Sequence, residues 1–288
     1  MALRIGITLG DPAGIGPEIV RAALASGKLP PDVEYRVVGE SGNTVPGKPT
    51  SDSARTALAA MEQAASLARL GHIEAIVTGP IHKARMSEIG FAFPGQTEFF
   101  ADRAGASNYA MLLFAGAITV ALVTTHIPLS EVPRRLKRSE IVRVGKLLVD
   151  YLSRPDHARP RIAVAGLNPH AGESGKIGRE EIEIIAPAID DLRREVQAAD
   201  FDGPISPDTL FYHLAQGRWD AALCMYHDQG LIPLKLHGFE QGVNVTLGLP
   251  FPRTSPDHGT AFEIAGKNIA RSESMIAAIS CAVELAKK

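Results

Sequence analysis

Short, apolar, β-rich runs alternate with helical patterns along almost the whole chain. The runs cover residues 4–9, 35–38, 75–78, 111–114, 119–124, 161–165, 221–225 and 243–247. Between them, apolar residues recur at helical spacing over residues 58–68, 141–151 and 182–196, and Pro187 predicts a kink or an earlier start in the last of these. This alternation predicts an α/β protein with largely parallel sheets covered by helices on both faces.

The size and composition of the chain allow a large core and exclude several classes of protein. At 288 residues and 45% hydrophobic, the chain is long enough for two α/β domains. No Pro/Gly-rich linker divides it, so we expect the domains to share the chain discontinuously. The net charge of -2 gives no electrostatic reason to expect nucleic acid or an anionic membrane as a partner. No apolar run approaches the roughly 20 residues of a membrane span.

The cysteines and the N-terminus indicate where such a protein would work. Cys224 and Cys281 are too few and too isolated for a disulfide framework or a zinc knuckle, which suits a reducing compartment. The N-terminus reads at once as a strand and has no basic region followed by an apolar one, as a secretion signal would. We therefore expect a soluble, cytoplasmic protein.

Three histidines stand in distinctive phrases, each directly after a strand-like run. They are His126 in TTH, His170 in NPHAGE and His227 in YHDQG. Since α/β folds place ligand sites outside the carboxyl ends of their strands, the three imidazoles could meet there and hold a divalent metal with positions open to substrate. Each histidine taken alone would suit an ordinary polar loop. Zinc, cobalt and manganese fit three imidazoles better than magnesium does.

A glycine-rich loop, GDPAGIGPE at residues 10–18, follows the first strand and opens a helix. Glycines there let the backbone approach a ligand, and the free N–H groups of a helix start favour an anion, although a plain tight turn explains the motif equally well. Neither G-x-G-x-x-G nor G-x-x-x-x-G-K-[ST] occurs, so no conventional Rossmann or P-loop site is expected. Residues 41–50, rich in Gly, Pro, Ser and Thr, read as a surface loop.

Two further regions offer groups for an anionic ligand. Thr97 follows a Pro-Gly turn, where it could equally cap the next helix. Lys235, Asn244 and Arg253 lie close together in the sequence. Because Arg binds phosphate or carboxylate through a bidentate fork and Lys through a point charge, these residues are typical of a pocket rim.

The loop at residues 257–267, DHGTAFEIAGK, places small residues and N–H groups around a turn. Its carboxylate, Glu263, could accept hydrogen bonds from a ribose diol and would repel a 2′-phosphate. This pattern favours NAD over NADP, while an ordinary Gly-punctuated loop is the alternative.

Together, these phrases resemble the 4-hydroxythreonine-4-phosphate dehydrogenase family, which oxidises 4-phosphooxy-L-threonine with NAD on a route to pyridoxal phosphate. The resemblance runs in order from residue 3 to about residue 267 through GDPAGIGPE, VTGPIHK, TTHIPL, GLNPHAGE, YHDQGLIPLK, GVNVTLGLPF and IAGK. GIGPE and HGTA-x-x-IAGK are also similar to motifs of isopropylmalate and isocitrate dehydrogenases. That kinship implies two α/β/α domains with largely parallel sheets around a central cleft, and an NAD site that is not of the Rossmann type.

The resemblance also implies roles for residues of this chain. The metal ligands fall on His126, His170 and His227. Asp208 lies close to the metal, and either Asp208 or Lys235 is the catalytic base. Substrate contacts fall on Gln96, Thr97, Lys235, Asn244 and Arg253, and the NAD loop contains Gly259, Thr260, Glu263, Gly266 and Lys267.

Members of the family are homodimers whose active site is completed by the second subunit. We therefore expect a homodimer whose three histidines need not all come from one protomer. We expect a discontinuous domain of residues 1–98 plus 240–288, and a second domain of residues 99–239 that carries the metal ligands and the dimer interface.

The chain departs from the family at position 96, where relatives have histidine and this sequence has Gln96. A glutamine can donate a hydrogen bond but carries no positive charge, which leaves the phosphate affinity and the identity of the substrate open. The segment at residues 41–50 is also shorter than in typical members, which a surface loop tolerates.

The expected reaction depends on NAD and a divalent metal. It oxidises 4-phosphooxy-L-threonine to 2-amino-3-oxo-4-phosphooxybutanoate, and decarboxylation to 3-amino-2-oxopropyl phosphate follows. One alternative keeps this chemistry and acts on threonate or erythronate 4-phosphate. Another is a metal-dependent hydrolase, which would leave the loop at residues 257–267 without a role.

Overall fold

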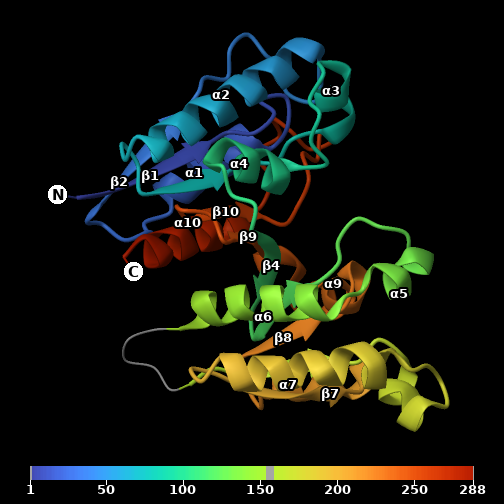
Figure 1. The fold of residues 1–288 in the computed structure, drawn as a ribbon. Coiled ribbons are helices and arrows are strands. Elements are labelled where there is room, and N and C mark those ends of the chain that lie inside the picture. The colour runs from blue at the N-terminus through green and yellow to red at the C-terminus, as the bar shows by residue number, and fades with distance from the viewer. Residues whose placement is uncertain (1, 154–158, 288) are drawn as a thin grey trace. The chain divides into compact units, whose positions relative to one another are not determined.

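Two compact units share the chain discontinuously in the computed structural model, which describes residues 2–153 and 159–287 (Figure 1). Unit 1 comprises Met1–Ser107 and Glu240–Lys288, and unit 2 comprises Asn108–Phe239. The first boundary therefore follows Ser107 rather than residue 98. The reason is that helix α4 (Gln96–Ala104) packs against helix α2 (Ser51–Arg69) and so belongs to unit 1.

Unit 1 contains a mostly parallel sheet with the strand order β2-β1-β3-β10-β9. Its strands are β1 (Leu3–Thr8), β2 (Val33–Val38), β3 (Ala75–Thr78), β9 (Val243–Leu247) and β10 (Arg253–Pro256). Only β9 runs antiparallel to its neighbour within the unit, β10. Helices α1 (Gly16–Ala25) and α10 (Glu273–Ala286) pack together on one face, and α2 covers the other with α3 (Lys83–Glu88) beside it (Figure 1). Met61, Ile76, Phe99 and Phe100 lie in the core between α2 and the sheet.

Unit 2 repeats the arrangement with the strand order β4-β5-β8-β6-β7. Its strands are β4 (Ala110–Ala115), β5 (Ile118–Leu122), β6 (Arg161–Ala165), β7 (Asp200–Ile205) and β8 (Ala221–Cys224). Strands β5, β8, β6 and β7 are parallel, and β4 forms an antiparallel hairpin with β5. The helices are α5 (Val132–Arg135), α6 (Arg138–Leu152), α7 (Ala186–Glu195), α8 (Pro207–Ala215) and α9 (His227–Gly238).

The α/β class and the strands predicted from the sequence are confirmed, with ends shifted by one or two residues. Strands β7 and β10 were not predicted. Strand β7 lies at the edge of its sheet and is only partly buried, while β10 buries the polar residues Arg253, Thr254 and Ser255. Neither therefore shows the apolar pattern of a core strand. Pro187 lies in the first turn of α7, which continues directly from a π-helical turn at Glu181–Ile185, so the predicted irregularity takes the form of this π-helical turn.

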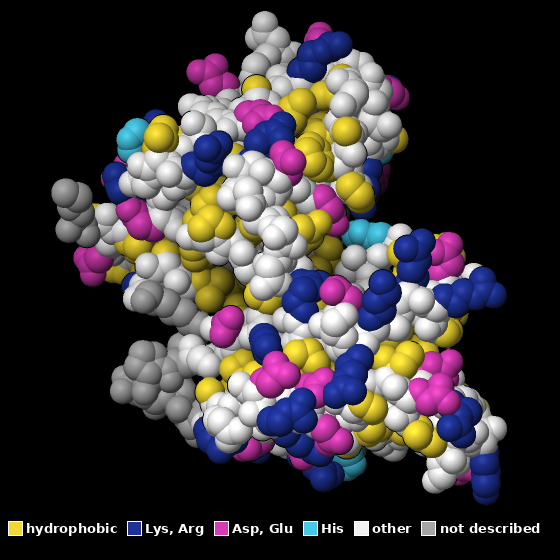
Figure 2. Space-filling view, viewed as in Figure 1, with side chains coloured by type: hydrophobic (Ala, Val, Ile, Leu, Met, Phe, Trp, Pro, Cys, Tyr) yellow, Lys and Arg dark blue, Asp and Glu magenta, His cyan; other side chains and the backbone are white. Residues whose placement is uncertain are grey.

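The face of unit 2 formed by α6 and α7 carries charges of both signs. Figure 2 shows Lys and Arg side chains interleaved with Asp and Glu side chains over this face. Arg138 and Arg194 both pair with Asp191, and Lys146 pairs with Glu195 at 2.8 Å. This mixed surface is typical of solvent-exposed helices. Among the helices that the structure describes, none has both the length and the apolar character needed to cross a bilayer.

Candidate active site

The three predicted histidines follow three neighbouring parallel strands of unit 2. His126 comes after β5, His170 after β6 and His227 after β8, and the sheet order places β8 between β5 and β6. Because the carboxyl ends of parallel strands meet at one edge of a sheet, all three loops leave the same edge. The topology therefore gives the histidine phrases a common location.

His126 and His227 are brought side by side. Their ring centroids are 5.6 Å apart, with the rings inclined at 43°. Both line a cavity of about 340 Å³, together with Thr124, Tyr226 and Asp228. The Nδ1 atom of His227 lies 2.7 Å from Oδ1 of Asp228, and this carboxylate fixes the orientation of the ring and leaves Nε2 available as a ligand atom.

His170 lies instead beside Asp208. The hydroxyl of Ser206 donates a hydrogen bond of 2.6 Å to Oδ1 of Asp208. This bond, together with the nearby charge of His170, lowers the pKa of Asp208 below its usual value. Asp208 is therefore an ionised carboxylate at neutral pH, next to the third predicted ligand.

Imidazole and carboxylate groups are suitable ligands for a divalent metal. In this chain they form two separate pairs, His126 with His227 and His170 with Asp208. Within residues 2–153 and 159–287, no group of three or more His, Cys, Asp or Glu side chains lies close enough to share one ion. The pair of His126 and His227 thus provides two imidazole positions of the predicted trio, while His170 stands with Asp208. The placement of all three ligands around one ion stays a prediction.

The loop that carries His170 has an uncommon backbone. His170, Ala171, Gly172, Glu173 and Ser174 all have positive φ, between 44° and 79°, so that the chain forms a short left-handed turn. Each residue with a side chain costs about 1–2 kcal/mol in this conformation. Because such strain persists only where the surroundings impose it, the turn needs strong anchors.

Glu181 is the main anchor of this turn. It is 3% exposed, and its Oε1 accepts hydrogen bonds of 2.7 Å from the backbone N–H groups of both Leu167 and Asn168. Its Oε2 accepts a further bond of 2.9 Å from the side-chain amide of Asn168. Burial alone would raise the pKa of Glu181, but the hydrogen bonds from Asn168 and Leu167 outweigh burial and lower the pKa. Glu181 was not predicted from the sequence, because a carboxylate early in a predicted helix is typical of an ordinary surface residue.

Unit 1 contains a buried cation at the predicted substrate position. Arg253 is 2% exposed and donates to the hydroxyl of Thr78 at 2.5 Å and, more weakly, to that of Thr246 at 3.4 Å. Burial lowers its pKa to about 9, which the carboxylate of Glu98 opposes, so the guanidinium is charged at neutral pH. The Nε atom of Arg253 is buried without a hydrogen-bond partner in the structure. A buried charge of this kind is stabilised by an anionic ligand.

Other polar residues of the same unit also have buried atoms without a hydrogen-bond partner in the structure. They include Oε1 of Gln96, Oε2 of Glu98 and Oδ1 of Asn244. The side-chain amide of Gln96 donates a hydrogen bond of 3.1 Å to the carbonyl of Gly79, and its Oε1 atom has no partner in the structure. The substitution of histidine by Gln96 thus presents a hydrogen-bond acceptor, whereas we expected a donor.

Thr97 does not cap helix α4, contrary to one interpretation of the sequence. The N-cap residue is Gly95, and Thr97 is the second residue of the helix, 5% exposed. The open start of α4 leaves backbone N–H groups that favour an anion. Lys235, the remaining predicted substrate contact, lies on α9 of unit 2 and is half-buried, with Nζ 6.0 Å from the ring centroid of Phe239.

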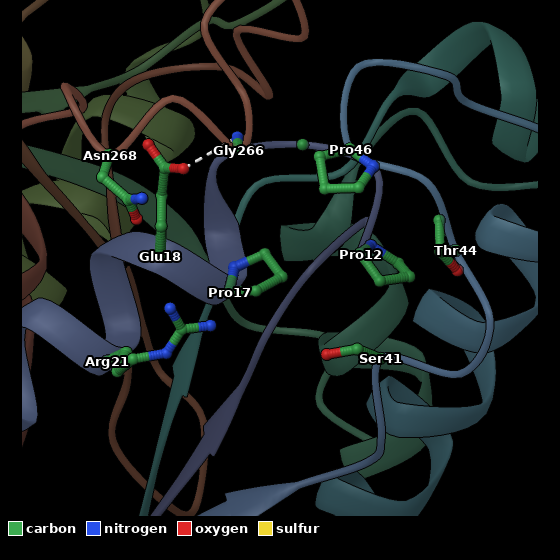
Figure 3. A pocket seen from close by; sticks show the side chains of 10 residues that line it. Pro12, Pro17, Glu18, Arg21, Ser41, Thr44, Pro46, Gly266 and Asn268 are labelled. Atoms are coloured by element: carbon green, nitrogen blue, oxygen red, sulfur yellow. Dashed lines mark hydrogen bonds between the residues drawn. The ribbon is translucent and has the colours of Figure 1, made fainter.

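The predicted NAD loop borders a cavity of about 280 Å³ in unit 1, shown in Figure 3. Its lining combines the glycine-rich loop and α1 (Pro12, Gly14, Pro17, Glu18, Arg21) with Ser41, Thr44 and Pro46, and with Gly266 and Asn268 of the predicted loop. Residues 41–50, interpreted from the sequence as a surface loop, therefore form one wall of this cavity. Of the predicted cofactor residues, Gly266 lines the cavity and Thr260 is buried, while Gly259, Glu263 and Lys267 are exposed.

The glycine-rich loop supports the predicted NAD loop. The N–H of Ile15 donates to the carbonyl of Thr260 at 2.9 Å, and a Cβ on Gly14 would lie 2.7 Å from that same oxygen. The carboxylate of Glu18 accepts a bond of 2.8 Å from the N–H of Gly266, drawn in Figure 3, and one of 3.3 Å from the N–H of Ala270. The N–H groups of Gly14 and Ile15 both donate within the protein, to the carbonyls of Asp11 and Thr260, so these two groups hold the loop itself in shape.

Comparisons with known proteins agree with this architecture. The chain matches the family described as pyridoxal phosphate biosynthetic protein PdxA over residues 20–282. It is 43% identical to a 4-hydroxythreonine-4-phosphate dehydrogenase of Paracoccus denitrificans, with 98% of this chain and 97% of that protein covered. It is 37% identical to a D-threonate 4-phosphate dehydrogenase of Pectobacterium atrosepticum, with 99% and 100% covered.

Solved structures show the same relationship. The 4-hydroxythreonine-4-phosphate dehydrogenase of Klebsiella pneumoniae superposes with a TM-score of 0.81 at 37% identity, covering 99% of both chains. An isocitrate dehydrogenase of Methylococcus capsulatus, at 18% identity and a TM-score of 0.56, shares the fold and covers 98% of this chain and 85% of its own. The resemblance inferred from the motifs is thus confirmed, and the chain belongs to the PdxA family of dehydrogenases.

Proposed function

We propose that this protein oxidises 4-phosphooxy-L-threonine to 2-amino-3-oxo-4-phosphooxybutanoate with NAD and a divalent metal. Loss of carbon dioxide then gives 3-amino-2-oxopropyl phosphate, a step of pyridoxal 5′-phosphate biosynthesis. The observation that carries the proposal is the buried, charged Arg253, whose Nε lacks a partner in the structure beside the open start of α4. A phosphorylated ligand supplies the charge that this arrangement needs.

The substrate phosphate is held in unit 1 in this proposal. Arg253 donates to it through the guanidinium, and the first turn of α4 contributes the hydroxyl of Thr97 and backbone N–H groups. Asn244 and Gln96 present oxygen atoms, which accept hydrogen bonds from hydroxyl or ammonium groups of the ligand rather than from its phosphate. Lys235 keeps its predicted role as a substrate contact.

The hydroxyl to be oxidised is activated by residues of unit 2. His126, His170 and His227 would hold the divalent ion, and the ion would lower the pKa of the substrate hydroxyl. Asp208 and Lys235 remain the two candidate bases for the hydroxyl proton. Lys235 would then stabilise the enolate left by decarboxylation.

The cavity beside the predicted NAD loop is the proposed site for the adenosine part of NAD. Gly14 and Gly266 line this cavity and have no side chain, so the adenine ring can approach the backbone closely there. The carboxylate of Glu18 accepts two backbone N–H groups and so helps to hold the predicted NAD loop in place. Glu263, exposed on the same loop, keeps the role proposed from the sequence, in which it binds the ribose diol and disfavours NADP.

We also propose a homodimer that works in the cytoplasm. Helix α9 exposes an apolar stripe in which Ile232, Leu236 and Phe239 are 66%, 88% and 71% exposed. A second copy of the chain that covered this stripe would bury its apolar side chains next to His227. The second copy could then supply its His170 to the pair of His126 and His227. Cys224 and Cys281 are buried and form no disulfide with each other, which suits a reducing compartment.

A second candidate substrate is threonate 4-phosphate, or its erythronate isomer. It is favoured by the relative of Pectobacterium atrosepticum and by Gln96, since an acceptor oxygen at this position suits a hydroxyl as well as an ammonium group. The chemistry at the histidines is the same in both cases.

The deciding experiment is NADH formation at 340 nm with metal-loaded protein. 4-Phosphooxy-L-threonine, D-threonate 4-phosphate and D-erythronate 4-phosphate are offered separately at equal concentration. Turnover of the amino substrate with the highest kcat/KM supports the primary proposal, and a preference for a sugar-acid phosphate replaces it with the second. Calorimetric titration with NAD tests the hydrolase alternative, because a hydrolase has no use for the cofactor.

The metal requirement is tested with His170→Ala. We expect this variant to lose turnover while its affinity for NAD, measured by calorimetry, stays within about twofold of wild type. An active His170→Ala protein in metal-free buffer would overturn the metal-dependent mechanism.

A further inference from the structure

Gln229 occupies an unusual position between two of the histidine loops. It lies in the first turn of α9 and is 7% exposed. Its Oε1 accepts a hydrogen bond of 2.7 Å from the N–H of Met225, and its Nε2 donates one of 2.6 Å to the carbonyl of Gly166. A single side-chain amide therefore joins the end of β8 to the end of β6.

The chemistry of the two partners fixes which end of the amide faces which loop. The N–H of Met225 can only donate, and the carbonyl of Gly166 can only accept. Glutamine meets both needs at once. A glutamate at this position would still accept the hydrogen bond from Met225. Its second oxygen would then face the carbonyl oxygen of Gly166, and the two acceptors would repel each other.

The same group of bonds extends to the third histidine loop. The carbonyl of Met225 accepts hydrogen bonds from the backbone N–H of Thr124 at 3.2 Å and from its hydroxyl at 2.7 Å. On the other side, the two residues after Gly166 are held by Glu181. The hydrogen bonds thus connect Thr124, Met225 and Gly166. These residues precede His126 and His227 by two positions and His170 by four.

We infer that Gln229 is a positioning residue that sets the spacing between the loops carrying His170 and His227. It touches no reacting atom in this scheme, because both ends of its amide bind backbone groups. The inference rests on the proposed function, in which these histidines bind the divalent ion. A misplaced ligand of this kind typically weakens metal affinity by about 10- to 100-fold.

The test compares Gln229→Glu with Gln216→Glu, the same substitution at an exposed glutamine of unit 2. Cobalt affinity is measured by chelator competition, and the visible absorption of bound cobalt reports the ligand geometry. For Gln229→Glu we expect affinity lower by about 10-fold or more and a changed spectrum, with the Kd for NAD unaltered. The Gln216→Glu protein should match wild type in all three measurements.

A second measurement keeps the inference testable without metal. Hydrogen exchange in the metal-free protein should be faster in Gln229→Glu in the segment at residues 166–168, because the bond to Gly166 is lost, while the core strand β5 keeps its protection. If the chain does not tolerate the glutamate, Gln229→Met removes both hydrogen bonds and keeps the length of the side chain, and it should also lower the cobalt affinity and speed exchange at residues 166–168.

The outcomes separate this inference from the proposed function. Wild-type protein that binds no cobalt refutes the metal-dependent function, and hydrogen exchange then decides the positioning role by itself. Wild-type protein that binds cobalt, with a Gln229→Glu variant of equal affinity, spectrum and exchange, refutes the positioning role and leaves the function intact.

Discussion

The two units hold their candidate ligand loops by different means. In unit 1, the predicted NAD loop rests on the glycine-rich loop through backbone contact, as in the bond from Ile15 to Thr260. In unit 2, the histidine loops are joined by two buried polar side chains, Gln229 and Glu181. Unit 1 therefore depends on the absence of side chains at a few glycines, whereas unit 2 depends on particular functional groups.

The difference predicts how each unit responds to substitution. Adding a single carbon should damage the backbone contacts of unit 1, where space is the limiting factor. Removing a single hydrogen-bonding group should damage unit 2, where strain and buried polar atoms are the limiting factors. The following variants test that contrast.

The largest effect is expected for Glu181→Leu in unit 2. The substitution leaves the N–H groups of Leu167 and Asn168 without their buried acceptor and frees the strained turn at His170. At about 1–3 kcal/mol for each unsatisfied group, we expect the free energy of unfolding to fall by about 3–5 kcal/mol. Urea denaturation measures it, with Glu183→Leu on the exposed side of the same turn as the control. Equal losses in both variants would contradict the anchoring role.

Gly16→Ala is the corresponding change in unit 1. A Cβ at this position would lie 1.8 Å from the carbonyl oxygen of Leu9, so the backbone must move. We expect the free energy of unfolding to fall by about 3 kcal/mol and the affinity for NAD to fall with it. Gly27→Ala is a poor control, because Gly27 has a positive φ. Ala22→Ser on the exposed face of α1 is better matched. A Gly16→Ala protein as stable as wild type would mean that the two units do not differ in the way described.

The acid stability of unit 2 should depend on Glu181. Its pKa in the folded state lies below the unfolded value of about 4.3, so its stabilising effect is complete above that value and is lost as the pH falls through the folded pKa. Urea denaturation of wild type and Glu181→Gln between pH 3 and pH 7 checks this. The difference in unfolding free energy should be largest near neutral pH and should narrow in acid. A difference that is constant over this range would rule out linkage to this carboxylate.

Glu18→Gln should have the smallest effect. The amide keeps one acceptor oxygen for the N–H of Gly266, and the bond to Ala270 is already long at 3.3 Å. We expect a loss of about 1 kcal/mol in unfolding free energy and a several-fold rise in the Kd for NAD, with the KM for the phosphorylated substrate unchanged. Calorimetry with NAD measures the Kd, and Glu34→Gln on exposed β2 is the control. A larger effect than that of Glu181→Leu would reverse the contrast between the units.

The sequence could predict the class of fold because apolar periodicity records burial. Strands such as β3 and β8 are buried throughout and stand out as apolar runs. Strand β10 could not be found in this way, since it buries Arg253 and Thr254 next to the proposed ligand site. The polar residues of β10 are explained by the proposed ligand site and not by packing within the sheet.

The candidate site shows a similar division. Strand ends and motif residues such as His126 and Arg253 could be picked out, because their types are unusual where they stand. Gln229 and Glu181 could not be assigned, since their partners are backbone groups that only the folded chain brings near. The role of residues 41–50 was missed for the same reason: a loop's composition does not tell which cavity it borders.

The left-handed turn at residues 170–174 has a consequence for engineering. Ala171 and Ser174 adopt a backbone conformation that glycine would adopt without cost, so glycine at either position relieves local strain. The same change loosens the unfolded chain and widens the range of shapes open to the loop. A glycine in this turn can therefore raise the stability of the fold while it makes the position of His170 less well defined. Variants in this turn should be screened for both properties.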